Sequence, residues 1–137
     1  MSGKKPTILV AEDEPDQTSI LNLLLSKVGY NPLFAVDGEK TLEFLRNGND
    51  ISLAIFDYGL PDMNGPTLTK RVREDKKYQG MPVIIMSANH LSSRQQKEEA
   101  MAAGANCYME KSVGPKELLA KIKELIGEKP TERAERY

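Results

Sequence analysis

The run Ile51-Ser52-Leu53-Ala54-Ile55-Phe56 is short, mostly apolar and followed directly by Asp57. Two similar runs are Thr7-Ile8-Leu9-Val10-Ala11 and Pro82-Val83-Ile84-Ile85-Met86. Short apolar runs that are rich in β-branched residues are typical of strands buried on both faces of a parallel sheet. We therefore expect each of these runs to be a strand.

Helical patterns lie between the strand-like runs. Leu21, Leu25 and Val28 are spaced at i, i+4 and i+7, and residues 118–126 carry a similar apolar stripe that stops before Gly127. Weaker strand-like runs at 31–36 and 107–110 complete five β-α pairs. Such pairs build an open parallel sheet with helices on both faces, and ligands bind beyond the carboxyl ends of its strands.

Two further helices can be placed by their first residues. The third should begin after Asn64-Gly65-Pro66, with Pro66 tolerated in the first turn, and the fourth near Ser92-Ser93, with Gln95 three residues after Ser92 to complete a capping box. The fourth helix has a thin apolar face, so we expect it to be the least firmly held. The residues of that face are Ala100, Met101 and Ala103.

We interpret the charges of the third helix region as a solvated face; they include Lys70, Arg71, Arg73, Lys76 and Lys77.

Composition and charge exclude several classes of protein. The chain has 137 residues, of which 39% are hydrophobic and 28% charged, which is typical of one globular domain. The net charge of -1 gives no electrostatic argument for binding nucleic acid or a membrane surface. We find neither a membrane-spanning stretch nor a signal peptide, so we expect a cytoplasmic protein. A single cysteine, Cys107, and a single histidine, His90, exclude an internal disulfide and a cysteine-based zinc site.

Polar residues follow the predicted strands at one edge of the sheet. Glu12 and Asp13 follow the first strand, Asp57 ends the third, Ser87 ends the fourth and Lys111 follows the fifth. Because the carboxyl ends of parallel strands meet at one edge, we expect these five side chains to converge.

The three carboxylates of this group need a positive charge. Two of them repel by about 4 kcal/mol at about 4 Å and an effective dielectric constant of about 20. Oxygen ligands suit Mg²⁺, which takes one or two carboxylates together with phosphate oxygens, and Lys111 supplies a further positive charge. An aspartate in such a site can attack phosphorus and form an acyl phosphate, and Asp57 is the best candidate for that nucleophile.

Four short motifs occur in order, each at the end of a predicted strand. They are Glu12-Asp13, Asp57-Tyr58-Gly59-Leu60-Pro61-Asp62-Met63-Asn64-Gly65, Ser87-Ala88 and Gly104-Ala105-Asn106-Cys107-Tyr108-Met109-Glu110-Lys111. This set resembles the receiver domain of two-component response regulators over about residues 5–127. The resemblance implies a flavodoxin-like (βα)5 fold, a doubly wound five-stranded parallel sheet in the order 2-1-3-4-5. We expect a receiver domain at 6–127, an N-terminal extension at 1–5 and a disordered tail or linker at 128–137.

The resemblance also implies a role for each residue of the predicted phosphorylation site. Asp57 is then the phosphoacceptor. Asp13, Asp57 and the backbone carbonyl of Gly59 bind Mg²⁺, and Glu12 acts through a bound water. Lys111 pairs with a phosphoryl oxygen.

The switch and the partners follow from the same resemblance. Ser87 binds another phosphoryl oxygen and moves toward Asp57, while Tyr108 turns inward. The altered surface comprises the fourth helix, the fifth strand and the fifth helix, and it controls binding of a protein target; a phosphorylation-dependent dimer is left open. The phosphodonor is a sensor histidine kinase or a histidine phosphotransfer protein. The protein is then not a turnover enzyme, although it assists its own phosphorylation and dephosphorylation.

Two departures from the family pattern have expected consequences. Ser112 follows the lysine of the last motif where the family usually has proline; a cis bond before a non-proline residue costs ~2.5–4 kcal/mol, so we expect a trans or strained bond. Gly59 and Asn89 lie two residues beyond Asp57 and Ser87, where side chains can position or block attacking water. We predict that these two positions tune the lifetime of the phosphoryl group.

Three other functions compete with a phosphorylated receiver. A phosphatase with an aspartyl nucleophile usually has a second acid two residues later, where this chain has Gly59. A flavodoxin-type cofactor binder needs a phosphate-cradling loop after the first strand, whereas Glu12-Asp13-Glu14-Pro15-Asp16 repels phosphate. The third alternative is a degenerate receiver that binds partners without being phosphorylated, and Ser112 is its best support.

Overall fold

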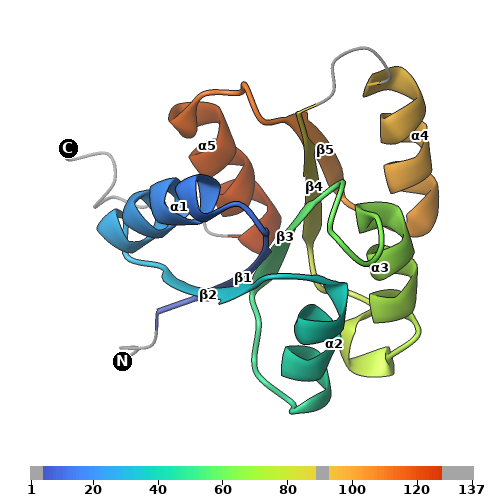
Figure 1. Cartoon of the computed structure of the whole chain (residues 1–137). Helices are drawn as coiled ribbons and strands as arrows, with labels where there is room; N and C mark the ends of the chain where they lie inside the picture. Colours follow the sequence, from blue (N-terminus) through green and yellow to red (C-terminus); the bar gives the residue numbers. More distant parts are fainter. Residues whose placement is uncertain (1–4, 89–92, 128–137) are drawn as a thin grey trace.

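The structure is a computed structural model, and it describes residues 5–88 and 93–127. Strands and α-helices alternate along the described residues (Figure 1). Their bounds are β1 (Thr7–Ala11), α1 (Pro15–Lys27), β2 (Asn31–Ala35), α2 (Gly38–Arg46), β3 (Leu53–Asp57), α3 (Gly65–Arg73), β4 (Val83–Ser87), α4 (Ser93–Ala103), β5 (Cys107–Glu110) and α5 (Pro115–Ile126), with a 3-10 turn η1 at Lys76–Tyr78.

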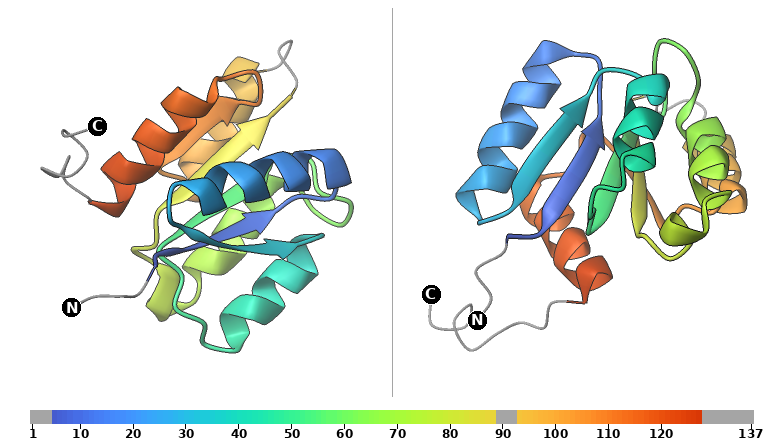
Figure 2. Two further views of the ribbon diagram at one scale, coloured as in Figure 1. Left: turned by 90° about the vertical axis from the view of Figure 1, so that its left-hand side faces the viewer. Right: turned by 90° about the horizontal axis from the view of Figure 1, so that it is seen from below.

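The five strands form one parallel sheet in the order β2-β1-β3-β4-β5. Helices α1 and α5 cover one face, and α2, α3 and α4 cover the other (Figures 1 and 2). The central strands β1, β3 and β4 are buried on both faces, as expected for strands of this kind. The predicted flavodoxin-like fold and its strand order are therefore confirmed.

The strand ends lie close to the predicted positions. Asp57 is the last residue of β3 and Ser87 the last of β4. Strand β3 begins at Leu53, two residues later than predicted, and Ile51 packs against the core from the preceding loop. The polar residues expected beyond the strands thus keep their places at the carboxyl edge of the sheet.

Three helix termini test the sequence patterns. Helix α3 begins at Gly65, so Pro66 lies in its first turn as expected, and its N-cap Asn64 accepts a hydrogen bond of 2.8 Å from the Thr67 N–H. Helix α5 ends at Ile126, and its C-cap Gly127 has a left-handed φ of 87°. The inward position predicted for Val28 is wrong: α1 ends at Lys27, and Val28 is 44% exposed.

Helix α4 differs from its predicted pattern. Ala100 and Ala103 are buried as expected, but Met101 is 43% exposed and the polar Gln96 is buried instead. The helix therefore buries little apolar surface, as its sequence indicates. The predicted cap Ser92 lies outside the described residues.

Arg73 corrects the interpretation of the charges around α3 as a solvated face. Its guanidinium donates hydrogen bonds to the carbonyls of Tyr78, Met81 and Gly104, at distances of 2.7–3.1 Å, and to Asn106 Oδ1 at 3.0 Å. Arg73 thus ties α3 to the loops at the amino edge of the sheet.

Within the described part of the chain, no helix is long and apolar enough to cross a membrane.

Candidate functional site

Three carboxylates meet at the carboxyl edge of the sheet. Glu12 and Asp13 directly follow β1, and Asp57 ends the neighbouring β3. Each residue has a carboxylate oxygen within 4.8 Å of the others. Glu12 is only 4% exposed, while Asp13 is exposed and Asp57 is half-buried. The convergence predicted for these acids is therefore present.

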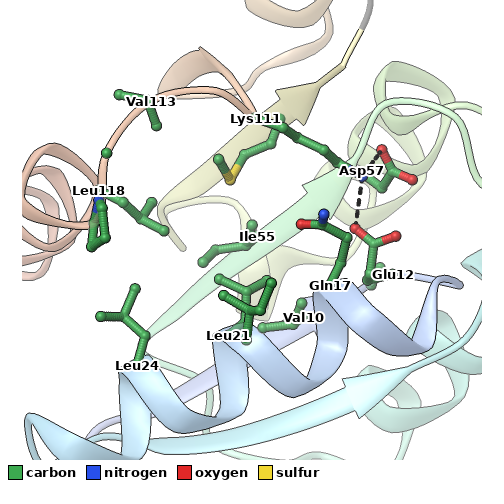
Figure 3. Close-up of a pocket in the computed structure, with 15 residues that line it drawn as sticks. Val10, Glu12, Gln17, Leu21, Leu24, Ile55, Asp57, Lys111, Val113 and Leu118 are labelled. Carbon is green, nitrogen blue, oxygen red and sulfur yellow. Dashed lines mark hydrogen bonds and ion pairs between the residues drawn. The ribbon is translucent and has the colours of Figure 1, made fainter.

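Lys111 enters this group from the end of β5. Its Nζ lies 2.9 Å from Glu12 Oε1 and 3.2 Å from Asp57 Oδ1 (Figure 3). Its backbone N–H donates to the Ser87 carbonyl at 2.8 Å, so the chain stays attached to β4 up to this residue. The Lys111–Ser112 bond is trans, since the described residues contain no cis peptide bond. The ammonium reaches the carboxylates without a proline after Lys111.

Burial dominates the electrostatics of the two inner acids. Burial raises the pKa of Glu12 despite its hydrogen bond from Lys111, and repulsion by Asp57 adds to the rise. Burial also raises the pKa of Asp57, although Lys111 and the Gly59 N–H oppose it. Burial disfavours the charged form of Lys111, but its contacts with Glu12 and Asp57 outweigh this and raise its pKa.

The donor set suits a divalent cation. One ammonium leaves two of the three ionised carboxylates uncompensated, and all three offer hard oxygen ligands. Such a set fits Mg²⁺, which binds through one or two carboxylates and keeps several waters.

Ser87 and Tyr108 lie on the α4 side of this edge. The Ser87 hydroxyl and the Tyr108 hydroxyl both donate hydrogen bonds to Gln96 Oε1 of α4, the latter at 3.1 Å. The sequence interpretation missed Gln96. A signal was available: Gln96, Ala100 and Ala103 are spaced at i, i+4 and i+7, which places a polar side chain on the inner face of the helix.

The loop between β3 and α3 shapes the other side of the site. The Gly59 N–H opposes the rise in the pKa of Asp57, and an added Cβ at Gly59 would meet nothing within 4 Å. Tyr58 donates a hydrogen bond to Glu99 of α4. Asn89, the second predicted lifetime position, lies outside the described residues.

A cavity of about 240 Å³ adjoins the carboxylates between α1 and α5 (Figure 3). Its walls are mostly apolar and include Leu21, Ile55, Met86 and Leu118, whereas Glu12, Asp57 and Lys111 line its polar end. The group of acids is therefore accessible from a hollow beside α1.

The comparisons with known proteins agree with this geometry. The family model of the response regulator receiver domain matches residues 8–123, so the chain belongs to that family. A relative, the chemotaxis protein CheY homolog of Campylobacter jejuni, is 29% identical over 121 residues, which cover 88% of this chain and 92% of that protein.

Solved structures extend the similarity to three dimensions. A CheY-like response regulator receiver domain protein from Methanospirillum hungatei is 30% identical with a TM-score of 0.82, covering 91% of this chain and 96% of that one. The receiver domain of the sensor histidine kinase PA1611 from Pseudomonas aeruginosa is 25% identical with a TM-score of 0.81, covering 90% and 99%. In that protein a magnesium ion is coordinated in the active site cleft.

Proposed function

We propose that this protein is cytoplasmic and that Asp57 accepts a phosphoryl group from the phosphohistidine of a sensor histidine kinase or histidine phosphotransfer protein. A carboxylate oxygen of Asp57 attacks the phosphorus, the phosphorus–nitrogen bond breaks, and the histidine leaves with its ring electron pair restored. The product is an acyl phosphate that water later hydrolyses. The observation that carries this proposal is the placement of Asp57 beside two further carboxylates and the Lys111 ammonium in a receiver domain.

The reaction needs positive charge beside the transferred group. We assign Mg²⁺ binding to Asp13, Asp57 and the Gly59 carbonyl, with Glu12 acting through a water. When bound, Mg²⁺ neutralises charge on the phosphoryl oxygens. Lys111 exchanges its contact with Asp57 for one with a phosphoryl oxygen, and the Ser87 hydroxyl binds another.

Phosphorylation of Asp57 changes the surface of the protein. We assign that surface to α4, β5 and α5, where an inward turn of Tyr108 accompanies the movement of Ser87. The altered surface binds a protein target or a second copy of the domain. Phosphorylation can favour the active state only by as much as its contacts differ between the two states.

Intact-protein mass after incubation with acetyl phosphate tests the site. We expect a gain of one phosphoryl group that requires Mg²⁺ and is lost in Asp57→Ala. Asp50→Ala is the matched control, because Asp50 is exposed and pairs only with the exposed Lys77 at 3.8 Å among the described contacts. A gain in Asp57→Ala equal to that of the wild type would contradict the proposal.

The degenerate receiver is the second candidate, and Ser112 is the observation that favours it. It predicts a folded protein that gains no phosphoryl group with or without Mg²⁺. The same mass measurement therefore separates the two functions.

A further inference from the structure

Gln96 is a buried polar residue of α4 that contacts two residues at the edge of the site. Its exposed fraction is 7%, and that of Ser87 is 3%. Its Oε1 accepts a hydrogen bond from the Ser87 hydroxyl and one of 3.1 Å from the Tyr108 hydroxyl. An amide oxygen has two lone pairs, so these two hydroxyls use its full capacity as an acceptor.

The hydrogen bond to Gln96 competes with any contact between Ser87 and a group bound on Asp57. Ser87 and Asp57 are the last residues of the neighbouring strands β4 and β3, and Asp57 is paired with Met86, the residue before Ser87. A serine hydroxyl has one hydrogen to donate. Ser87 must therefore give up its bond to Gln96 in order to donate to a phosphoryl oxygen.

Helix α4 is positioned to respond to that exchange. Its buried side chains are Gln96, Ala100 and Ala103, so apolar packing contributes little to holding it. A further polar contact of α4 at this edge, among the described residues, is the hydrogen bond from Tyr58, the neighbour of Asp57, to Glu99. Loss of the bonds to Gln96 thus removes polar contacts that fix α4 against the sheet.

We propose that Gln96 is a positioning residue that holds Ser87 and Tyr108 in the unphosphorylated arrangement and links both to α4. The inference rests on the proposed phosphorylation of Asp57 and deepens it. Phosphorylation draws the Ser87 hydroxyl from Gln96, and the amide oxygen then loses one of its two partners. Tyr108 is then the remaining partner of Gln96 at this edge, and movement of the less firmly held α4 breaks that second bond.

The first test is the rate at which acetyl phosphate with Mg²⁺ phosphorylates variants of Gln96. Gln96→Met keeps the length of the side chain but removes the acceptor, and we expect the rate to rise about fivefold, the factor expected for one net hydrogen bond. Gln96→Glu keeps acceptor oxygens for both hydroxyls and should not exceed the wild-type rate. Gln95→Met is the matched control, because the neighbouring Gln95 is exposed. Equal rates for Gln96→Met and the wild type would overturn the inference.

A second test separates positioning from a general loosening of the fold. In a Ser87→Ala background there is no hydroxyl at position 87 for Gln96 to hold, so Gln96→Met should raise the rate much less than in the wild type. An undiminished rise in that background would count against the inference.

The third measurement needs no phosphodonor. The fluorine signal of 3-fluorotyrosine at position 108, assigned with Tyr108→Phe, should move in Gln96→Met and not in Gln95→Met. In the wild type, phosphorylation should move it in the same direction. A wild-type protein that gains no phosphoryl group overturns the proposed function and the coupling with it. If the wild type is phosphorylated but the unphosphorylated wild type and Gln96→Met give the same Tyr108 signal, the inference alone is overturned.

Discussion

Lys111 and Glu12, which are 99 residues apart in the sequence, form an ion pair of 2.9 Å in which the Glu12 side chain is only 3% exposed. Removing one partner of a buried pair leaves the other charge without compensation. We expect Lys111→Met to lower the free energy of unfolding by about 2 kcal/mol without Mg²⁺, and added Mg²⁺ to restore part of it. Urea denaturation measures both effects. Lys121→Met is the control, since its 3.1 Å pair with Glu124 is at the surface and should contribute little to stability.

Gly59 leaves open space beside the phosphoacceptor. A Cβ there would meet nothing within 4 Å, so a larger side chain fits without strain. We expect Gly59→Met to slow the hydrolysis of phosphorylated Asp57 severalfold, because an apolar side chain shields the acyl phosphate from water. Loss of the phosphoryl mass after the donor is removed measures the rate. Gly80→Met, at an exposed glycine that also has nothing within 4 Å, should leave the rate unchanged; equal rates for both variants would refute the assigned role.

Gly65 is needed where α3 begins next to the site. Its added Cβ would lie 3.0 Å from the Asp57 carbonyl oxygen and 3.3 Å from Tyr58 Cα, both of which are backbone atoms. We expect Gly65→Ala to destabilise the protein by about 1–3 kcal/mol and to slow phosphorylation, because the loop that carries Asp57 must shift. Thermal unfolding and the mass assay measure the two effects. Gly80→Ala is the control, and a fully stable Gly65→Ala variant would show that the loop yields without cost.

Asp62 caps the first turn of α2 from another loop. Its carboxylate accepts hydrogen bonds of 2.8 Å from the Gly38 N–H and 3.0 Å from the Glu39 N–H. Desolvation opposes ionisation, but these backbone donors outweigh it and lower the pKa of Asp62. The stabilisation is therefore complete above the unfolded-state pKa of about 3.9 and is lost as the pH falls through the lower folded-state value.

We accordingly expect Asp62→Ala to cost about 1 kcal/mol at neutral pH, the usual contribution of a helix cap. The difference from the wild type should shrink below about pH 4, where the wild-type carboxylate also becomes protonated. Urea denaturation across this pH range measures it. A difference that stays constant down to acidic pH would show that the carboxylate charge is not involved.

Arg73 joins α3 to the amino edge of the sheet through both terminal nitrogens and Nε of its guanidinium. Lysine has one nitrogen with three donors and cannot reproduce this fork. We expect Arg73→Lys to lower the free energy of unfolding by about 2 kcal/mol while the folded variant is phosphorylated at the wild-type rate. Arg71→Lys is the control: its 3.3 Å pair with Glu39 is exposed and should change stability by at most about 0.5 kcal/mol.

The sheet and the acidic group could be predicted because each depends on a local pattern. Apolar runs such as Val83–Met86 mark the strands, and parallel strands bring the residues after them to one edge. The contact of Lys111 with Asp57 followed from the same rule.

The contacts of longer side chains could not be predicted in this way. Arg73 resembles its charged neighbours in sequence, and only the position of the loop at Gly104 reveals the carbonyl that it binds. Asp62 lies in a predicted loop, and its partner helix α2 begins 24 residues earlier in the chain. Such hydrogen bonds depend on the distance between loops in the folded protein. Neither residue spacing nor hydropathy predicts that distance.

The small apolar face of α4 has a thermal consequence. Heat-capacity changes in proteins come chiefly from exposure of apolar surface to water. A movement of α4 that exchanges hydrogen bonds and uncovers the methyl groups of Ala100 and Ala103, with the small apolar area that they cover, would have only a small heat-capacity change. The enthalpy of such a transition would then be nearly independent of temperature, and its van't Hoff plot would be straight. The balance between the two positions of this helix would thus follow temperature in a simple way, unlike the strongly curved stability of the fold that carries it.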